Sequence, residues 1–212
     1  MFISYNEACA RDCSTLEQDL VLCEKAGFDY IEIRLDMLTD YLKRHTVEEL
    51  AAFFCTSRLK PHAFNALYLY PEFLSEGDDE ARQKELLEEF RLGCEVGRAI
   101  GSHYFIIVPP LQRDPAGGPY TGSWEDTFSN CVRILKELSR RAEPYDMNLC
   151  FELVGFERSS VRSIGQADAV VRAVDRPNVG FVFDSYNIFL NGGCNDFSAI
   201  GSVQPAKIFA VH

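Results

Sequence analysis

The sequence predicts a (β/α)₈ TIM barrel that ends after its seventh strand, and two observations lead to this α/β fold class. Short apolar runs rich in Ile, Val, Phe and Tyr alternate with longer amphipathic stretches, which is the pattern of repeated βα units around a parallel sheet. Successive runs begin roughly 25 to 45 residues apart, as whole βα units of a barrel do. The chain has 212 residues, whereas a complete barrel usually needs about 250.

Seven apolar runs are the predicted strands. They span Phe2–Asn6, Tyr30–Leu35, Pro61–Tyr68, Tyr104–Val108, Leu149–Glu152, Val179–Asp184 and Ile208–His212. An eight-stranded barrel would need one more βα unit after His212. We therefore expect one domain over residues 1–212 that lacks its last βα unit, and a natural gene product that is longer, since a free-standing seven-stranded sheet would leave an edge unprotected.

The segments between the strands carry the signals of helices. Apolar residues recur at the spacing of one helix face in two of them, Leu16, Leu20 and Cys23 in the first and Leu86, Leu87, Phe90, Cys94 and Ile100 in the second. Thr46 and Ser123 are predicted N-caps because acidic residues follow them, and Gly27 and Gly101 are predicted to end helices. The segment Gln112–Gly122, which contains Pro and Gly, is expected to form a lid.

The charge balance and the lack of long apolar stretches limit the classes of partner. The chain carries 21 Lys and Arg against 32 Asp and Glu, a formal net charge of −11, which repels nucleic-acid backbones and anionic membranes. No apolar stretch approaches the roughly 18 residues that span a bilayer, and a strand-like segment follows Met1 in place of a signal peptide. We expect a cytoplasmic protein without a nucleic-acid or membrane partner, and a homo-oligomer is compatible with the sequence.

The eight cysteines are spread along the chain. Disulfide scaffolds are short and dense in cysteine, and zinc ribbons use paired CxxC spacings. We therefore expect reduced thiols without a metal or redox role, an expectation that is weakest for Cys9 and Cys13, four residues apart near the end of the first strand.

Polar residues that end apolar strands form the candidate site, because catalytic groups of such barrels lie at the carboxyl ends of the strands. Glu152, Asp184 and His212 end the fifth, sixth and seventh predicted strands, each directly after an apolar run. A charge at such a position is costly without a partner. A single acid there is more often a cap or an ion-pair partner, but two carboxylates and an imidazole on one rim suit Zn²⁺, Mn²⁺, Co²⁺ or Mg²⁺. We predict that the three residues bind one divalent metal ion.

Four further polar residues on the first three strands are candidates for substrate binding. Asn6 ends the first strand. Glu32 and Arg34 share one face of the second strand by the period-two rule, so a buried ion pair between them is as compatible with the sequence as substrate binding. Asn65 on the third strand could bind substrate or satisfy a neighbouring backbone group.

Six segments of the chain carry a resemblance to a known family. They are Tyr5–Ala8, Leu20–Arg34, Phe64–Leu67, Phe151–Gly155, Asn178–Ser185 and Lys207–His212. These segments closely resemble the inosose isomerases, or 2-keto-myo-inositol isomerases, of bacterial inositol catabolism, which belong to the xylose-isomerase-like barrel superfamily. The resemblance spans the chain, and the segments from the second and sixth strands are the most specific.

The resemblance implies a ligand set and one departure from it. The family's metal-binding glutamate, aspartate and histidine match Glu152, Asp184 and His212, whereas its fourth ligand, a glutamate on the eighth strand, has no counterpart here. The family commonly has Asp-x-x-His, and this chain has Asn187 in place of that histidine. Asparagine can donate a hydrogen bond to a substrate oxygen but does not titrate near neutral pH, so we expect Asn187 to bind substrate.

The reaction that the resemblance implies is metal-assisted isomerisation of an α-hydroxyketone, a polyol ketone derived from inositol, through an enediolate. A carboxylate must remove a C–H proton, and Glu152 is our choice for the catalytic base. A ketose 3-epimerase shares the metal and the barrel and stays an alternative, as does a non-catalytic remnant or binding module. An endonuclease IV-like DNA-repair enzyme is disfavoured by the acidic charge and by the presence of only four histidines.

Overall fold

The computed structural model describes residues 2–10, 13–112, 118–192 and 197–212. Seven parallel strands form one sheet in the order β1-β2-β3-β4-β5-β6-β7. They are β1 (Ser4–Asn6), β2 (Tyr30–Arg34), β3 (Lys60–Tyr68), β4 (Tyr104–Val108), β5 (Asn148–Glu152), β6 (Val179–Phe183) and β7 (Ile208–Val211). Each of the seven predicted strands is confirmed to within two residues at either end, and with them the barrel fold class.

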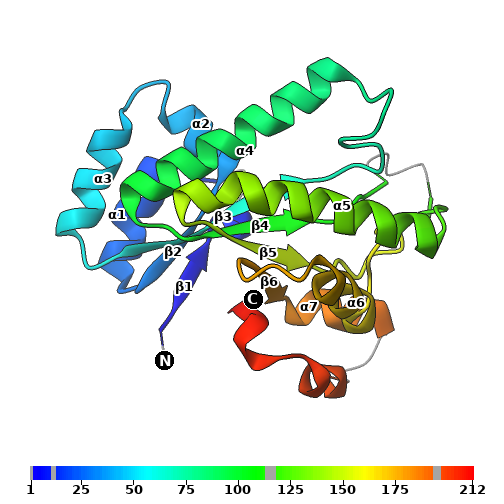
Figure 1. The fold of residues 1–212 in the computed structure, drawn as a ribbon. Helices are drawn as coiled ribbons and strands as arrows, with labels where there is room; N and C mark the ends of the chain where they lie inside the picture. The colour runs from blue at the N-terminus through cyan, green and yellow to red at the C-terminus, as the bar shows by residue number, and fades with distance from the viewer. Residues whose placement is uncertain (1, 11–12, 113–117, 193–196) are drawn as a thin grey trace.

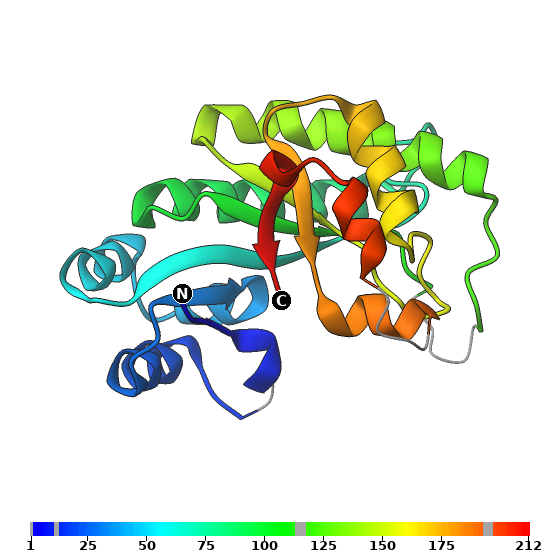
Figure 2. The same ribbon diagram turned by 90° about the horizontal axis from the view of Figure 1, so that it is seen from below.

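Helices on the connections cover the convex outer face of the sheet. They are α1 (Leu16–Ala26), α2 (Leu35–Tyr41), α3 (Val47–Thr56), α4 (Glu80–Ile100), α5 (Trp124–Ala142), α6 (Ile164–Val174) and α7 (Ser185–Gly192), with short 3-10 turns η1 (Glu7–Ala10), η3 (Glu143–Tyr145), η4 (Ser198–Ser202) and η5 (Pro205–Lys207). Figure 1 shows α4 and α5 lying side by side along the sheet. The turned view in Figure 2 shows the sheet curving so that β7 returns toward β1.

The period-two alternation of the strands divides the core into two layers. Along β4, Phe105 and Ile107 pack outward into the large cluster between the sheet and the helices, whereas Ile106 and Val108 belong to a smaller cluster inside the curved sheet. The same alternation applies to the strands that carry the candidate site. The outward positions there are apolar, so the intervening acids face the interior of the barrel.

The predicted helix ends are confirmed. Thr46 forms a capping box with Glu49, and the Ser123 side chain accepts a hydrogen bond from the backbone N–H of Asp126. Gly27 and Gly101 end α1 and α4 with φ of 88° and 84°, a left-handed conformation that side chains with a Cβ rarely adopt.

In the described part of the chain, no helix is both long enough and apolar enough to cross a membrane. The seven cysteines in that part form no disulfide with one another. Cys194 lies outside the described residues, as do residues 113–117 of the expected lid.

Candidate metal centre

The three predicted ligands meet at the carboxyl ends of neighbouring strands. Glu152 is the last residue of β5, Asp184 directly follows β6, and His212 directly follows β7. One possible ligand atom from each lies within 4.8 Å of the others. The register explains this convergence, because Glu152 pairs with Val182 of β6 and Phe183 pairs with Val211 of β7.

Glu152 is a buried carboxylate held at one oxygen. Its Oε1 accepts a hydrogen bond from Nδ2 of Asn187 over 3.1 Å, and its side chain is among the buried charged groups of the chain. Burial raises the pKa of Glu152 to about 7; the charge of His212 opposes this rise, and the negative charges of Asp184 and Glu32 add to it. A carboxyl with such a pKa can both take up and return a proton near neutral pH.

Asp184 caps the helix that follows it. Its Oδ1 accepts a hydrogen bond from the backbone N–H of Asn187 over 2.9 Å. The side-chain oxygen of the same asparagine accepts from the backbone N–H of Gly155 over 3.2 Å. Asn187 is buried. Through its hydrogen bonds it links the first turn of α7 to two of the candidate ligands, Glu152 and Asp184.

His212 is fixed by its backbone and by its ring. Its N–H donates to the carbonyl of Phe183 over 2.9 Å, and its carbonyl accepts from the N–H of Ser185 over 3.1 Å. Nε2 of the ring lies 2.8 Å from Oε2 of Glu32. Burial by itself lowers the pKa of His212, but the hydrogen bond and charge of Glu32, with the charges of Glu152 and Asp184, outweigh this and raise the pKa to about 9.

This arrangement fits a divalent cation. Glu152, Asp184 and Glu32 supply three carboxylates around one imidazole, so even a protonated His212 leaves the cluster with an excess of negative charge. Among the described residues, Oε2 of Glu152, Oδ2 of Asp184 and Nδ1 of His212 have no hydrogen-bond partner, so each ligand is held at one atom and free at another. Two oxygens and one nitrogen are a donor set that Zn²⁺, Mn²⁺, Co²⁺ and Mg²⁺ accept.

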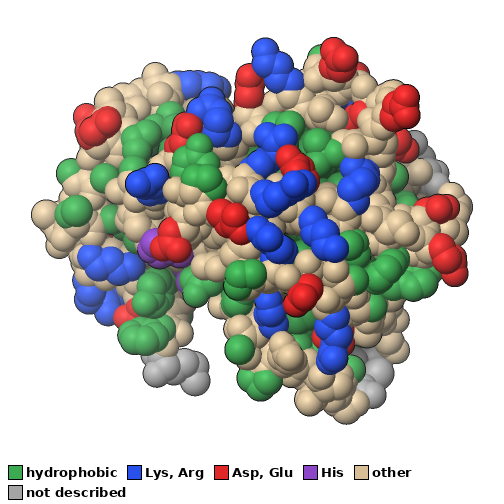
Figure 3. Space-filling view, viewed as in Figure 1, with side chains coloured by type: hydrophobic (Ala, Val, Ile, Leu, Met, Phe, Trp, Pro, Cys, Tyr) green, Lys and Arg blue, Asp and Glu red, His purple; other side chains and the backbone are tan. Residues whose placement is uncertain are grey.

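The predicted substrate residues are divided between two hollows. Asn6 and Glu32 line an open hollow of about 1370 Å³ together with Asp184 and His212. Figure 3 shows a notch at the lower edge of the molecule between the N-terminal strand and the C-terminal segment, where residues of both line this hollow. Within it, Oδ1 of Asn6 accepts from the backbone N–H of Ala8 over 2.9 Å, so Asn6 also shapes the turn after β1.

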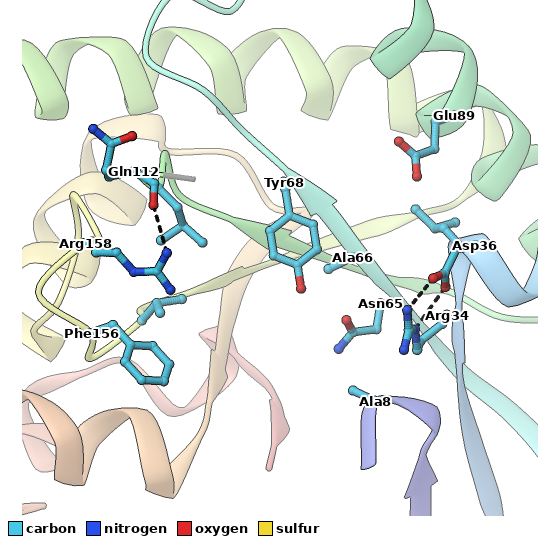
Figure 4. A pocket seen from close by; sticks show the side chains of 13 residues that line it. Ala8, Arg34, Asp36, Asn65, Ala66, Tyr68, Glu89, Gln112, Phe156 and Arg158 are labelled. Carbon is cyan, nitrogen blue, oxygen red and sulfur yellow. Dashed lines mark hydrogen bonds and ion pairs between the residues drawn. The ribbon is translucent and has the colours of Figure 1, made fainter. Parts of the chain in front are cut away.

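Arg34 and Asn65 line a second cavity of about 590 Å³. In Figure 4 they stand on one side of it, with Phe156 and Arg158 on the other and Tyr68 between. The ion pair between Glu32 and Arg34 that the sequence left open is not formed, because Arg34 pairs with Asp36. Among the residues that the structure describes, the side chain of Asn65 bonds to Glu32 and to no backbone group. Its Nδ2 donates to Oε1 of Glu32 over 2.8 Å and so links the two hollows.

Comparison with known proteins agrees with this geometry. The family model of the xylose isomerase-like TIM barrels matches residues 20–212. The "Inosose isomerase" of Halalkalibacterium halodurans is 36% identical over all of this chain and 71% of its own length, and that of Bacillus subtilis is 35% identical over all of this chain and 72% of its own. The chain belongs to the inosose isomerase family.

Solved structures place this isomerase among the same barrels. A crystal structure of the IolI protein with a bound zinc atom superposes with a TM-score of 0.87 at 36% identity, over all of this chain and 72% of the other. A D-psicose 3-epimerase superposes with a TM-score of 0.76 at 15% identity, which shows a common fold alone. The isomerase therefore spans about seven tenths of the length of these relatives.

Two residues that line the second cavity of this inosose isomerase family member were not predicted. Phe156 and Arg158 follow β5 and face Arg34 and Asn65 across the cavity. Their signal in the sequence is their place in the segment directly after a strand end, since loops at that end of a barrel build its sites. An aromatic ring and an arginine in such a loop have no further pattern that distinguishes them from ordinary surface residues.

Proposed function

We propose that this protein is a divalent-metal-dependent isomerase of an inosose, 2-keto-myo-inositol, a cyclic α-hydroxyketone. The observation that carries the proposal is the convergence of Glu152, Asp184 and His212 within 4.8 Å, in a chain that is 36% identical to a named inosose isomerase. Membership of the family makes the chain an isomerase, and the metal site gives that isomerase a chemistry suited to a hydroxyketone.

Glu152 is the proposed catalytic base. Isomerisation of an α-hydroxyketone requires that a proton leave the carbon next to the carbonyl and return to a neighbouring position. Glu152 is proposed to bind the metal through one oxygen and to accept and return this proton with the other. Its Oε1 is held by Asn187, so the proton is taken at a fixed position. A positioned base of this kind contributes about 10²- to 10⁴-fold to the rate.

The metal would be held by Glu152, Asp184 and His212. A divalent ion there supplies Lewis-acid stabilisation of the negative charge that develops on the carbonyl oxygen. The cavity of about 590 Å³, which the Asn65–Glu32 hydrogen bond connects to the hollow lined by Asp184 and His212, is of a size that accepts a small polyol. Arg34 and Asn65 are the proposed substrate-binding residues there, and Asn6 is the one proposed in the hollow that Asp184 and His212 line. Glu32 and Asn187, which the sequence also suggested for substrate, hold ligand side chains instead.

The test combines metal analysis with an assay on three substrates. The protein loaded with Zn²⁺ or Mn²⁺ should hold one ion and convert inosose faster than fructose or hydroxypyruvate. Preference for fructose would replace the proposal with a ketose epimerase, and a protein without metal or turnover would be a non-catalytic barrel. Neither result depends on the choice of ligand residues.

Glu152→Gln tests the residue assignment. The amide keeps the size of the side chain but cannot act as a base, so we expect turnover to fall by at least about 10²-fold and metal affinity to fall with it. Glu157→Gln is the matched control, because Glu157 is an exposed residue in the next loop. An active Glu152→Gln enzyme would refute the role of Glu152.

A further inference from the structure

Glu32 lies between two side chains that come from distant parts of the chain. It is on the inner face of β2 and its side chain is 2% exposed. One oxygen, Oε2, lies 2.8 Å from Nε2 of His212, and the other, Oε1, accepts a hydrogen bond from Asn65 over 2.8 Å. Both oxygens of a buried carboxylate are therefore engaged by protein groups, as the burial of a charge requires.

We propose that Glu32, itself fixed by Asn65, is a positioning residue that orients the ring of His212 so that Nδ1 is the atom offered to the metal. The contact with Glu32 occupies Nε2, which leaves Nδ1 as the ring nitrogen without a partner among the described residues. This inference rests on the proposed metal-dependent function and adds to it the nitrogen that binds and the groups that select it.

Two other roles for Glu32 fit the geometry less well. A fourth metal ligand would have an atom close to the ligand atoms of the other three. The residues whose ligand atoms converge in the described part of the chain are Glu152, Asp184 and His212, without Glu32. As a substrate-binding residue it would need a free oxygen, and both oxygens are engaged.

Carboxylate groups behind metal-binding imidazoles have a known physical effect. A histidine that donates its second N–H to a carboxylate is fixed in one tautomer and one orientation, and it is a more basic ligand. Removal of such a carboxylate typically weakens metal binding 10- to 100-fold. Here the contact also joins β2 to the residue after β7, 180 positions apart in the sequence. A residue of the second strand thereby holds a ligand that follows the seventh strand.

The first test measures zinc affinity by competition with a chromophoric chelator. We expect Glu32→Leu to bind zinc about 10- to 100-fold more weakly than the unsubstituted protein, and Glu32→Gln, which keeps the shape, to bind at least about tenfold more weakly. Asp146→Asn is the matched control and should leave the affinity unchanged. Like Glu32→Gln, it changes a carboxylate beside a histidine to an amide. The histidine is His103, whose Nδ1 lies 3.4 Å from Oδ2 of Asp146, and both side chains are exposed.

The second test identifies the binding nitrogen and separates positioning from a simple loss of charge. Long-range ¹H–¹⁵N spectra of zinc-loaded protein with ¹⁵N-labelled histidine report which ring nitrogen carries metal and which carries hydrogen. The spectra are simple because the chain has four histidines. We expect metal at Nδ1 and hydrogen at Nε2 for His212, and a loss of this single form in Glu32→Leu.

The outcomes distinguish this inference from the proposed function. If the unsubstituted protein binds no zinc, the metal-dependent function fails. If it binds zinc through Nε2 of His212, or if both Glu32 variants keep full affinity and the same binding nitrogen, the function stands and the positioning role is overturned. Should Glu32→Leu not fold, as judged by circular dichroism, the affinity of Glu32→Gln decides the question.

Discussion

Asn187 connects two of the candidate ligands through two different atoms. Its side-chain Nδ2 donates to Oε1 of Glu152 over 3.1 Å, while its backbone N–H donates to Oδ1 of Asp184 over 2.9 Å. A single residue in the first turn of α7 thereby sets the orientation of both carboxylates. It occupies the position at which the resemblance led us to expect a substrate contact, and in the structure it contacts protein groups.

Asn187→Ala should lower kcat for inosose by about 10- to 100-fold. The substitution leaves Oε1 of Glu152 buried without its donor, and a hydrogen bond to a charged group is worth about 1.5–3 kcal/mol. Asn191→Ala, one turn further along α7 at an exposed position, is the control and should keep full activity. Steady-state kinetics at saturating zinc measure both. Full activity of Asn187→Ala would mean that the orientation of Glu152 does not depend on this hydrogen bond.

Zinc binding should release protons. The pKa of Glu152 is raised to about 7 and that of His212 to about 9 in the metal-free protein, and both groups must be deprotonated to bind a metal. Affinity should therefore rise between pH 6 and pH 9, with about two protons released per ion near pH 6. Calorimetric titrations in two buffers of different ionisation enthalpy count these protons. Equal heats in both buffers would contradict the prediction.

Glu7→Gln should make stability less sensitive to pH. Glu7 is fully buried, its Oε2 accepts from the backbone N–H of Arg34 over 2.8 Å, and its Oε1 has no partner among the described residues. Burial raises the pKa of Glu7 to about 8, with the nearby Asp19 adding to the rise and Arg34 opposing it. Because the folded pKa lies above the unfolded value, the stability that Glu7 contributes is complete below about pH 4.5 and is lost as pH rises through about 8.

The measurement for Glu7 is urea unfolding of the metal-free protein at pH 5 and pH 9. The unsubstituted protein should lose more free energy of unfolding between these values than Glu7→Gln does, by a few kcal/mol. Glu48→Gln, an exposed carboxyl on α3, should behave as the unsubstituted protein does. A Glu7→Gln protein with the same pH dependence as the unsubstituted one would show that Glu7 does not titrate in this range.

Gly180→Ala should weaken zinc binding from a distance. A Cβ at position 180 would lie 2.3 Å from the backbone oxygen of Lys207 and 2.7 Å from the ring of Phe209, so β7 would have to shift away from β6. Overpacking of this kind costs about 1–3 kcal/mol of stability. His212 follows β7 and should move with it. Chelator competition should then give a lower affinity, whereas Gly165→Ala, where a Cβ meets no atom within 4 Å, should leave it unchanged.

The strands and the three ligands could be predicted because both follow from local patterns. Apolar runs interrupted by helical stretches define the strands, and an acid or histidine at the end of such a run has to face the interior of the barrel. Glu152, Asp184 and His212 therefore converge as a consequence of parallel register. The family resemblance added the reaction class, which the spacing of the residues does not contain.

The partners of the second-strand residues could not be predicted, because they depend on how far the sheet curves. Glu32 and Arg34 alternate with outward-facing apolar residues, as the period-two rule requires, yet one contacts His212 from the far end of the chain and the other pairs with Asp36. The spacing gives the face of the strand but not the neighbour across the barrel. The same holds for Asn187, whose amide finds Glu152 only once α7 is packed against β5.

The most direct test of the metal centre is an anomalous-difference map from crystals of the zinc-loaded protein, collected at the zinc absorption edge. The proposed site predicts one strong peak at about 2.0–2.2 Å from an oxygen of Glu152, an oxygen of Asp184 and Nδ1 of His212. A peak elsewhere, or none within bonding distance of these three residues, would contradict it.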